Sequence, residues 1–328
     1  MTNRTDWAQA TEVVKAAQRI LVVTHVSPDG DAIGSLLGLT NALRGQGHRV
    51  SCAVDGGVPG YLNFVSGSAM VHSELTSGEW DLMISVDASD EERTGAVGEY
   101  GRAHSQQVIN LDHHATNTMF GDVFLVMPSA VSASEVIYHW LIYMGLPITT
   151  DVAVPLLTGL VTDTLGFRTN NVTAPTLGMA MRLMESGAVL SEITARTLDS
   201  KSYRVIELWK GALPSATLQG EVIEASVTQE DLRRARMDEV SDGGLVSLLI
   251  KTNEARVAVV FKELEDGRVE ISLRSKPGYD VSQVALGVGG GGHKQAAGAT
   301  IDGPLEAARA RILPLLQQVV AAGVPVAK

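Results

Sequence analysis

Short apolar runs recur along the first half of the sequence, and each is followed by a helical or loop segment. The runs are RILVVTH (19–25), HRVSCAVD (48–55), WDLMISVD (80–87) and QQVINLDHH (106–114). Apolar runs of this length are typical of strands that are buried on both faces, and the intervening segments suit crossover helices. We therefore predict an α/β fold with a parallel sheet and helices on both of its faces.

Helical periodicity occurs before, between and after these runs. Helices are predicted over 6–19, over a Leu-, Gly- and Ala-rich segment that ends at Gly45 and Gly47, over 132–144 and 151–162, and over most of 174–215.

The pattern changes in the last third of the chain. EVIEASVT (221–228) and ARVAVVFKELEDGRVEISLRSK (255–276) predict antiparallel strands, the latter a hairpin that turns at Asp266-Gly267. A glycine-rich loop and a helix over 304–322 complete a smaller α+β domain. A chain of 328 residues has room for two cores. We predict one domain over 1–190, a helical linker over 191–216 and a second domain over 217–328, with the active cleft between the two domains.

Composition narrows the range of partners and compartments. The net charge of −11 disfavours long nucleic acids, whereas a small anion needs only one locally positive cleft. Cys52 is the single cysteine, so an intrachain disulfide is excluded, a thiolate metal site is unsupported, and a small core residue is expected. The polar start MTNRTDWAQA does not resemble a signal peptide, and we expect a cytoplasmic protein with no membrane partner.

Acidic residues and histidines gather where the apolar runs end. In open α/β sheets, ligands bind beyond the carboxyl ends of the strands. The residues at or just after predicted strand and helix ends are His25, Asp29, Asp31, Asp87, Asp112, His113, His114 and Asp163. Carboxylates that meet in one region repel one another unless cations are bound. Carboxylate oxygens mixed with imidazoles suit Mn²⁺ or Mg²⁺ better than Zn²⁺ or Fe²⁺.

This many ligands exceeds the need of one ion. Two divalent cations about 3.5–4 Å apart, bridged by a carboxylate and a water, serve many phosphate-cleaving enzymes. Asp87 stands alone at the end of the central run and is our candidate bridge. A calcium EF-hand loop is excluded because its fifth and twelfth positions are Ile33 and Thr40. Taken alone, His25 has an alternative role as a core histidine, and Asp87 has one as a helix N-cap. The combination of these residues with the other strand-end carboxylates and histidines favours a metal site.

Four segments in order carry a family resemblance: THVSPDGDAIGS (24–35), SVDASD (85–90), LDHHATN (111–117) and GLVTDTLGFR (159–168). Together they resemble the motif set of the DHH phosphoesterase superfamily. The resemblance implies one Mn²⁺ at His25, Asp29 and Asp87, and a second at Asp31, Asp87, His113 and Asp163. It also implies that His114 faces the phosphate as a catalytic residue and that Asp112 orients an imidazole.

A glycine-rich segment, GVGGGGHKQAAG (287–298), stands near the end of the chain. It formally satisfies G-x-G-x-x-G, but VSQVAL before it reads as helix rather than strand, so we reject a dinucleotide site. A flexible linker is the alternative to an anion cradle, which His293 and Lys294 favour. Upstream, Arg274 and Lys276 share one face of a predicted strand. The alternative to a role in substrate binding is that both side chains are solvated at the edge of the sheet.

These features resemble the DHH-associated C-terminal domain, in the branch that degrades very short oligonucleotides and 3′-phosphoadenosine 5′-phosphate. The resemblance implies that Arg274 and His293 contact the phosphate or base of the substrate and that Gly290 and Gly291 allow its close approach. We also predict that Lys276 binds substrate. Val288 departs from the family, which usually has an aromatic residue there. Arg168 is a further phosphate-binding candidate, with a surface ion pair as its alternative.

We predict a Mn-dependent phosphodiesterase that hydrolyses short RNA or DNA oligonucleotides, including linear dinucleotides, to mononucleotides, and the nucleoside bisphosphate to AMP. The first domain is then catalytic and the second recognises substrate. The alternatives are a single-strand DNA exonuclease, an inorganic pyrophosphatase and a non-catalytic nucleotide-binding adaptor. The sequence leaves open the substrate length, the direction of hydrolysis, Mn²⁺ against Mg²⁺, and the oligomeric state, for which a homodimer is one candidate.

Overall fold

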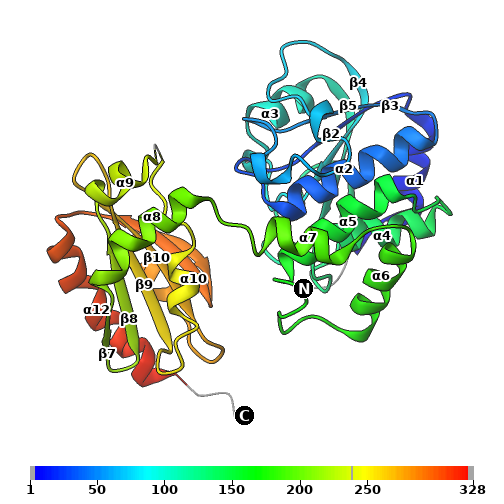
Figure 1. Cartoon of the computed structure of the whole chain (residues 1–328). Coiled ribbons are helices and arrows are strands. Elements are labelled where there is room, and N and C mark those ends of the chain that lie inside the picture. Colours follow the sequence, from blue (N-terminus) through cyan, green and yellow to red (C-terminus); the bar gives the residue numbers. More distant parts are fainter. Residues whose placement is uncertain (1–3, 238, 324–328) are drawn as a thin grey trace. The chain divides into compact units, whose positions relative to one another are not determined.

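The computed structural model describes residues 4–237 and 239–323 (Figure 1). The chain forms two compact units, Met1–Ser200 and Lys201–Lys328. The predicted linker, 191–216, contains a helix of each unit: α7 (Leu190–Thr197) in the first and α8 (Tyr203–Ala212) in the second.

A six-stranded sheet of order β1-β6-β5-β4-β2-β3 forms the centre of the first unit. Its strands are β1 (Arg4–Thr5), β2 (Arg19–Val23), β3 (Arg49–Ala53), β4 (Trp80–Val86), β5 (Ser105–Asp112) and β6 (Val123–Val126). All neighbours are parallel except the two-residue β1, which pairs antiparallel with β6. The predicted parallel sheet is confirmed, while β1 and β6 were not predicted because each is too short to give a pattern.

Helices cover both faces of this sheet, as predicted (Figure 1). They are α1 (Trp7–Ala16), α2 (Gly30–Gly45), α3 (Gly95–Ala103), α4 (Ala133–Tyr143), α5 (Thr150–Asp163), α6 (Ala174–Glu185) and α7, with 3-10 turns at Gly60–Leu62, Ser68–Met70 and Glu92–Thr94. Alternate residues of β2 separate the two cores: Ile20 and Val22 pack with α1, α2, α4 and α5, whereas Leu21 and Val23 pack with α3. Cys52 is fully buried, as predicted.

Helices α2 and α5 approach closely because glycines line their contact. Gly30, Gly34 and Gly38 recur at intervals of one helical turn on α2. A Cβ at Gly34 would lie 2.5 Å from the Pro155 carbonyl oxygen and 2.8 Å from the Gly159 nitrogen of α5. Because neither backbone atom can rotate away, glycine is required there. The close packing fixes the start of α2 relative to the end of α5.

The second unit contains a mixed six-stranded sheet of order β11-β12-β10-β9-β8-β7. Its strands are β7 (Thr217–Gln219), β8 (Val222–Val227), β9 (Val257–Glu263), β10 (Val269–Ser275), β11 (Gly291–His293) and β12 (Ala296–Ile301). Its helices are α8, α9 (Gln229–Ala235), α10 (Leu245–Leu249), α11 (Ser282–Gly287) and α12 (Leu305–Ala322), with a 3-10 turn at Leu213–Ser215.

Two expectations for this unit were wrong. The β9–β10 hairpin is present, but β8 and β9 pair in parallel rather than antiparallel. The reason is the long connection between them, which contains α9 and α10 and returns the chain to the same end of the sheet. The glycine-rich segment is also not all loop, because Gly291–His293 forms an edge strand paired with β12. Glycine disfavours strands in isolation, so its sequence gave no strand signal.

Across the described residues, 4–237 and 239–323, no helix combines the length and apolarity needed to cross a lipid bilayer.

The α2–α5 contact gives a stability prediction. Gly34→Ala should lower the free energy of unfolding by about 1–3 kcal/mol, because the new methyl group meets fixed backbone atoms. The matched control is Gly178→Ala inside α6, where a Cβ meets nothing within 4 Å and alanine should stabilise by up to about 1 kcal/mol. Urea unfolding followed by circular dichroism measures both. Equal effects of the two substitutions would contradict the proposed contact.

Candidate metal centre

The acidic residues and histidines singled out in the first unit converge at the carboxyl ends of three neighbouring strands. His25 follows β2, Asp87 follows β4 directly, and His113 follows the end of β5. Two helix ends meet them there, with Asp31 in the first turn of α2 and Asp163 as the last residue of α5. Sheet order explains the convergence, because β2, β4 and β5 are adjacent and parallel.

Three groups of side chains offer ligand atoms that lie within 4.8 Å of one another. The groups are His25, Asp29 and Asp87; Asp31, His113 and Asp163; and Asp87, Asp112, His113 and His114. The first two are the ligand sets predicted from the family resemblance, apart from the bridging residue in the second. Asp87 and His113 each belong to two groups, so the groups form one continuous cluster.

Asp87 lies in the middle of this cluster and faces both sides. Its Oδ2 is 3.6 Å from His25 Nε2, and its Oδ1 is 3.6 Å from His113 Nε2. These separations are too long for hydrogen bonds. Two atoms that each bind one cation at about 2.1 Å are about 3–4 Å apart. The spacing therefore suits side chains that share a cation.

The backbone and burial of Asp87 also indicate a functional position. Its φ of 57° lies in the left-handed region, which is strained for a residue with a side chain. The carboxylate is 2% exposed, and Oδ1 has no hydrogen-bond partner among the residues that the structure describes. Burial, with the negative charges of Asp31 and Asp29, raises the pKa of Asp87 well above its ordinary value. A cation beside Oδ1 would supply the missing partner.

The hydrogen bonds of His25 prepare its ring for metal binding. Nδ1 is 2.8 Å from the Val26 carbonyl oxygen. Because a carbonyl only accepts, Nδ1 carries the proton and Nε2 keeps its lone pair. That lone-pair nitrogen faces Asp87. A backbone acceptor that fixes the tautomer in this way is usual for metal-binding histidines.

Asp29 and Asp31 are held by backbone N–H groups at helix starts. Asp29 caps α2, because its Oδ1 accepts from the N–H groups of Asp31 and Ala32, both at 3.0 Å. Asp31 is placed against the start of α4, with Oδ2 2.6 Å from the Ala133 nitrogen and Oδ1 3.1 Å from the Ser134 nitrogen. These donors partly offset the negative charge and fix both carboxylates before any ligand binds.

The second group, Asp31, His113 and Asp163, has the electrostatics expected of metal ligands. His113 Nε2 faces Asp163 Oδ2 at 3.5 Å and Asp31 Oδ2 at 4.0 Å. Burial raises the pKa of Asp163 to about 8, and Asp31 and Asp29 add to the rise. Burial also raises the pKa of Asp31 and lowers that of His113. Each charged form is thus disfavoured by burial, and a divalent cation would reverse this for the two carboxylates.

A network of hydrogen bonds orients His114. Its Nδ1 is 2.7 Å from Asp112 Oδ1, and the other oxygen of Asp112 accepts from Asn117 Nδ2 at 2.6 Å. Asn117 is held in turn by Asn110. Burial alone would raise the pKa of Asp112, but the His114 contact outweighs it and the net pKa is lowered. Burial would likewise lower the pKa of His114, but Asp112 raises it overall. Sequence reasoning missed both asparagines, although Asn117 lies within LDHHATN.

Known proteins resemble this chain over nearly its whole length. A family model described as the DHH family, N-terminal domain, matches residues 19–160, and the DHHA1 domain matches residues 222–322. A relative from Thermus thermophilus, named bifunctional oligoribonuclease and PAP phosphatase NrnA, is 34% identical over 94% of this chain and 92% of its own length.

The chain belongs to the DHH family of phosphoesterases.

A second relative agrees with this assignment, and a solved structure shares the fold. The NrnA protein of Bacillus subtilis, which has the same name, is 29% identical over 86% of this chain and 89% of its own length. The crystal structure of an exopolyphosphatase-related protein from Bacteroides fragilis shares the fold, with a TM-score of 0.86, 24% identity and coverage of 96% and 95% of the two chains. DHH enzymes depend on divalent metal ions, which agrees with the acidic and imidazole cluster.

The predicted substrate residues of this DHH enzyme lie mostly in its second unit. Arg274 on β10 is half-buried, its Nη1 donates to the Leu273 carbonyl at 3.0 Å, and burial lowers its pKa. Lys276 Nζ donates to the carbonyls of Thr252 and Asn253. Both cations therefore have backbone acceptors but no carboxylate within 4 Å among the described residues.

The remaining candidates differ in their surroundings. A Cβ at Gly290 would lie 2.2 Å from the Gly298 carbonyl oxygen, so packing within the sheet already requires glycine there, whereas Gly291 has open space. The side chain of His293 lies outside the described atoms. Arg168 in the first unit is exposed, and its Nε donates to the Leu165 carbonyl. The substrate-binding roles of these residues remain predictions.

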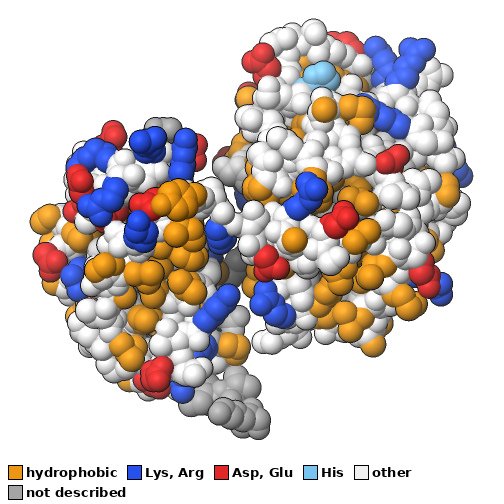
Figure 2. All heavy atoms as spheres, in the orientation of Figure 1, with side chains coloured by type: hydrophobic (Ala, Val, Ile, Leu, Met, Phe, Trp, Pro, Cys, Tyr) orange, Lys and Arg blue, Asp and Glu red, His pale blue; other side chains and the backbone are white. Residues whose placement is uncertain are grey.

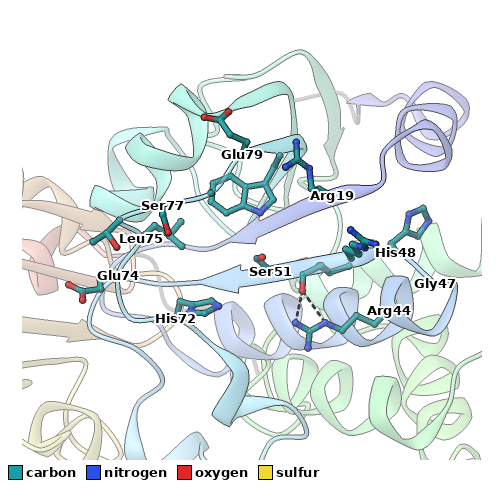
Figure 3. A pocket seen from close by; sticks show the side chains of 15 residues that line it. Arg19, Arg44, Gly47, His48, Ser51, His72, Glu74, Leu75, Ser77 and Glu79 are labelled. Atoms are coloured by element: carbon teal, nitrogen blue, oxygen red, sulfur yellow. Dashed lines mark hydrogen bonds between the residues drawn. The ribbon is translucent and has the colours of Figure 1, made fainter.

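A surface depression of about 800 Å³ lies at the opposite ends of the strands from the metal cluster (Figure 3). Arg19, Arg49 and Trp80, the first residues of β2, β3 and β4, line it together with Arg44 and His48. Arg44 is committed to the fold there, because its guanidinium donates to the Val50 carbonyl. None of the residues singled out from the sequence lines this depression.

The carboxylates around Asp87 predict that Asp87→Asn has opposite effects on stability with and without Mn²⁺. Asp87→Asn removes a buried charge that other carboxylates repel, so the metal-free protein should gain about 1 kcal/mol and melt about 2–4 °C higher. The stabilisation that wild-type protein gains from Mn²⁺ should be largely lost in this variant. Thermal unfolding with and without Mn²⁺ measures both changes.

The control is Asp81→Asn, a half-buried carboxylate outside the cluster whose Oδ2 accepts from two backbone N–H groups. It should leave the Mn²⁺-dependent shift unchanged. An Asp87→Asn protein that gains as much from Mn²⁺ as wild type would rule out this carboxylate as a ligand.

Proposed function

We propose that this DHH phosphoesterase hydrolyses short oligonucleotides to mononucleotides and 3′-phosphoadenosine 5′-phosphate to AMP, with two divalent cations, Mn²⁺ foremost. The names of the Thermus and Bacillus relatives, oligoribonuclease and PAP phosphatase, support the choice of substrates. The observation that carries the proposal is that Asp87 faces His25 with one oxygen and His113 with the other. A carboxylate placed in this way suits a bridge between two ions.

The residues divide into two ligand sets in this proposal. His25, Asp29 and Asp87 would hold one ion, and Asp31, Asp87, His113 and Asp163 the other. Bound cations lower the pKa of a water molecule and offset the charge that develops on phosphorus.

His114 is the residue of this chain best arranged to move a proton. Asp112 holds Nδ1–H, so the second nitrogen, Nε2, is left to interact with substrate. The opposing effects of burial and Asp112 leave the pKa of His114 above its ordinary value, which favours the protonated ring. We infer that Nε2–H hydrogen-bonds a phosphoryl oxygen or protonates the departing one. Asp112 and Asn117 then act by orienting the ring.

Charge supports short substrates. Lys and Arg side chains are interspersed with Asp and Glu on the face shown in Figure 2, and the chain as a whole carries −11. Long nucleic acids need many cationic contacts to their phosphates. A dinucleotide needs few, and we propose that the second unit supplies them through Arg274, Lys276, His293 and the adjacent glycines. A cytoplasmic location agrees with such substrates.

The decisive experiment is a turnover survey of the purified protein with Mn²⁺. Oligonucleotides of two to about twenty residues, 3′-phosphoadenosine 5′-phosphate and pyrophosphate would be compared by kcat/KM. We expect the highest values for the shortest oligomers and release of AMP from the bisphosphate. Asp31→Ala and His113→Ala should each reduce turnover by about 100-fold or more while the fold is retained. Preference for long single strands would instead indicate a DNA exonuclease, and no turnover with no bound metal would indicate an adaptor.

Arg274 provides a test of substrate recognition that is separate from chemistry. Arg274→Ala should raise KM for a dinucleotide by about tenfold, and KM for a nitrophenyl phosphodiester by less than about twofold, because the small ester lacks the second nucleoside. Arg268→Ala is the matched control on the same hairpin, since its guanidinium pairs with Asp266 beside it. Equal changes for both substrates would refute a recognition role for Arg274.

A further inference from the structure

We infer that Arg93 binds the reacting phosphoryl group of the substrate at the metal centre. The inference rests on the proposed function and adds a residue that neither the sequence motifs nor the ligand groups include. Arg93 lies in the 3-10 turn Glu92–Thr94, six residues after Asp87 in the loop that follows β4.

Backbone hydrogen bonds hold Arg93 beside the metal ligands. Its N–H donates to Asp90 Oδ1 at 2.9 Å, and its carbonyl accepts from the Val26 N–H at 2.8 Å. Val26 is also the residue whose carbonyl holds the His25 ring. The backbone of Arg93 is therefore two hydrogen bonds away from a predicted ligand. The same loop is tied to the segment after His114 by the Thr118 N–H, which donates to Ser89 at 2.8 Å.

The side chain of Arg93 is half-buried and has no partner. Among residues 4–237 and 239–323, no hydrogen bond, ion pair or ring contact of its guanidinium is found. Arg102 on the neighbouring helix α3 has its Nε 3.7 Å from Glu91 Oε1, while its Nη1 is buried and has no hydrogen-bond partner among the described residues. A partly desolvated guanidinium without an acceptor is unfavourable. It is the state expected of a side chain whose acceptor is a ligand.

The loop that contains Arg93 also adjoins His114. It begins at Asp87, whose Oδ1 is 3.7 Å from His114 Nδ1. His114 is the residue that the proposed mechanism directs at the phosphate. Arg93 therefore lies in a loop that contacts the segments of both a predicted metal ligand and the candidate proton donor.

The charge balance of the metal centre indicates a role for Arg93 in binding an anion. The cluster contains the carboxylates of Asp29, Asp31, Asp87, Asp112 and Asp163. Two divalent cations and a protonated His114 together just offset these five charges, so the loaded centre would have no excess positive charge for an anionic phosphate. A nearby guanidinium would supply that positive charge, and its fork of donors matches two phosphoryl oxygens. Stabilising charge that develops on those oxygens is worth about 100- to 1000-fold in rate for one well-placed donor.

The experiment compares Arg93→Gln, Arg93→Lys and the control Arg102→Gln in the full-length Mn²⁺-loaded protein. We expect Arg93→Gln to lower kcat/KM by about 100-fold for both a dinucleotide and a nitrophenyl phosphodiester, because both present the same reacting group. Arg93→Lys should recover part of this loss, since a point charge replaces the fork. Arg102→Gln should behave as wild type, and the melting shift caused by Mn²⁺ should be the same in all four proteins.

A second measurement separates this inference from the proposed function. Inorganic phosphate binding to the Mn²⁺-loaded protein, followed by calorimetry, should weaken by about tenfold in Arg93→Gln and stay unchanged in Arg102→Gln. If the wild-type protein turns over none of the phosphoesters, the proposed function is wrong. The phosphate titration would still test whether Arg93 binds phosphate. If kcat/KM of Arg93→Gln stays within twofold of the wild-type value, or if its affinity for phosphate is unchanged, the inference is overturned.

Discussion

Repulsion among buried carboxylates is the constraint on which the first unit depends. Asp87 is 2% exposed, has one oxygen without a hydrogen-bond partner in the described chain, and is surrounded by Asp29, Asp31, Asp112 and Asp163. Such an arrangement is unfavourable by itself and persists because the rest of the fold holds it in place. A bound cation would offset this cost. Affinity for divalent metal is therefore built into the fold rather than added to it.

Backbone atoms of the fold hold the clustered side chains in place. Helix starts hold Asp29 and Asp31, a carbonyl fixes the tautomer of His25, and glycines let α2 and α5 approach until Asp31 comes near the end of α5. Gly159 illustrates how tight this is, since a Cβ there would lie 2.4 Å from Asp31 Oδ1. Backbone donors keep their positions when solvent or substrate changes, so the ligands are arranged in advance. Preorganisation of this kind suits a metal centre that, in our proposal, binds two ions and then an anion.

The histidines and Arg93 have different roles in this centre. His25 and His113 both turn Nε2 toward Asp87, as metal ligands would, whereas Asp112 favours the protonated form of His114. Arg93, anchored by its backbone to the His25 loop, brings a permanent positive charge. One strongly acidic cluster thereby contains a place for cations and a place for an anion. In our proposal, substrate recognition beyond that point falls to side chains of the second unit, in a chain whose net charge of −11 disfavours extended contact with nucleic acid.

The sequence alone determined the parallel sheet, the order of its motifs and the identity of the acidic and histidine residues, because apolar periodicity and residue type are local properties. It could not reveal β6 or β11, whose strand character comes from neighbours rather than from their own residues, nor the parallel pairing of β8 with β9. Only the tertiary structure decided that Asp87 faces two histidines at once, that Asn117 supports Asp112, and that the Arg93 guanidinium has no partner among the residues that the structure describes. These are distances between atoms remote in sequence, and they exist only after the strands have paired and the helices have packed.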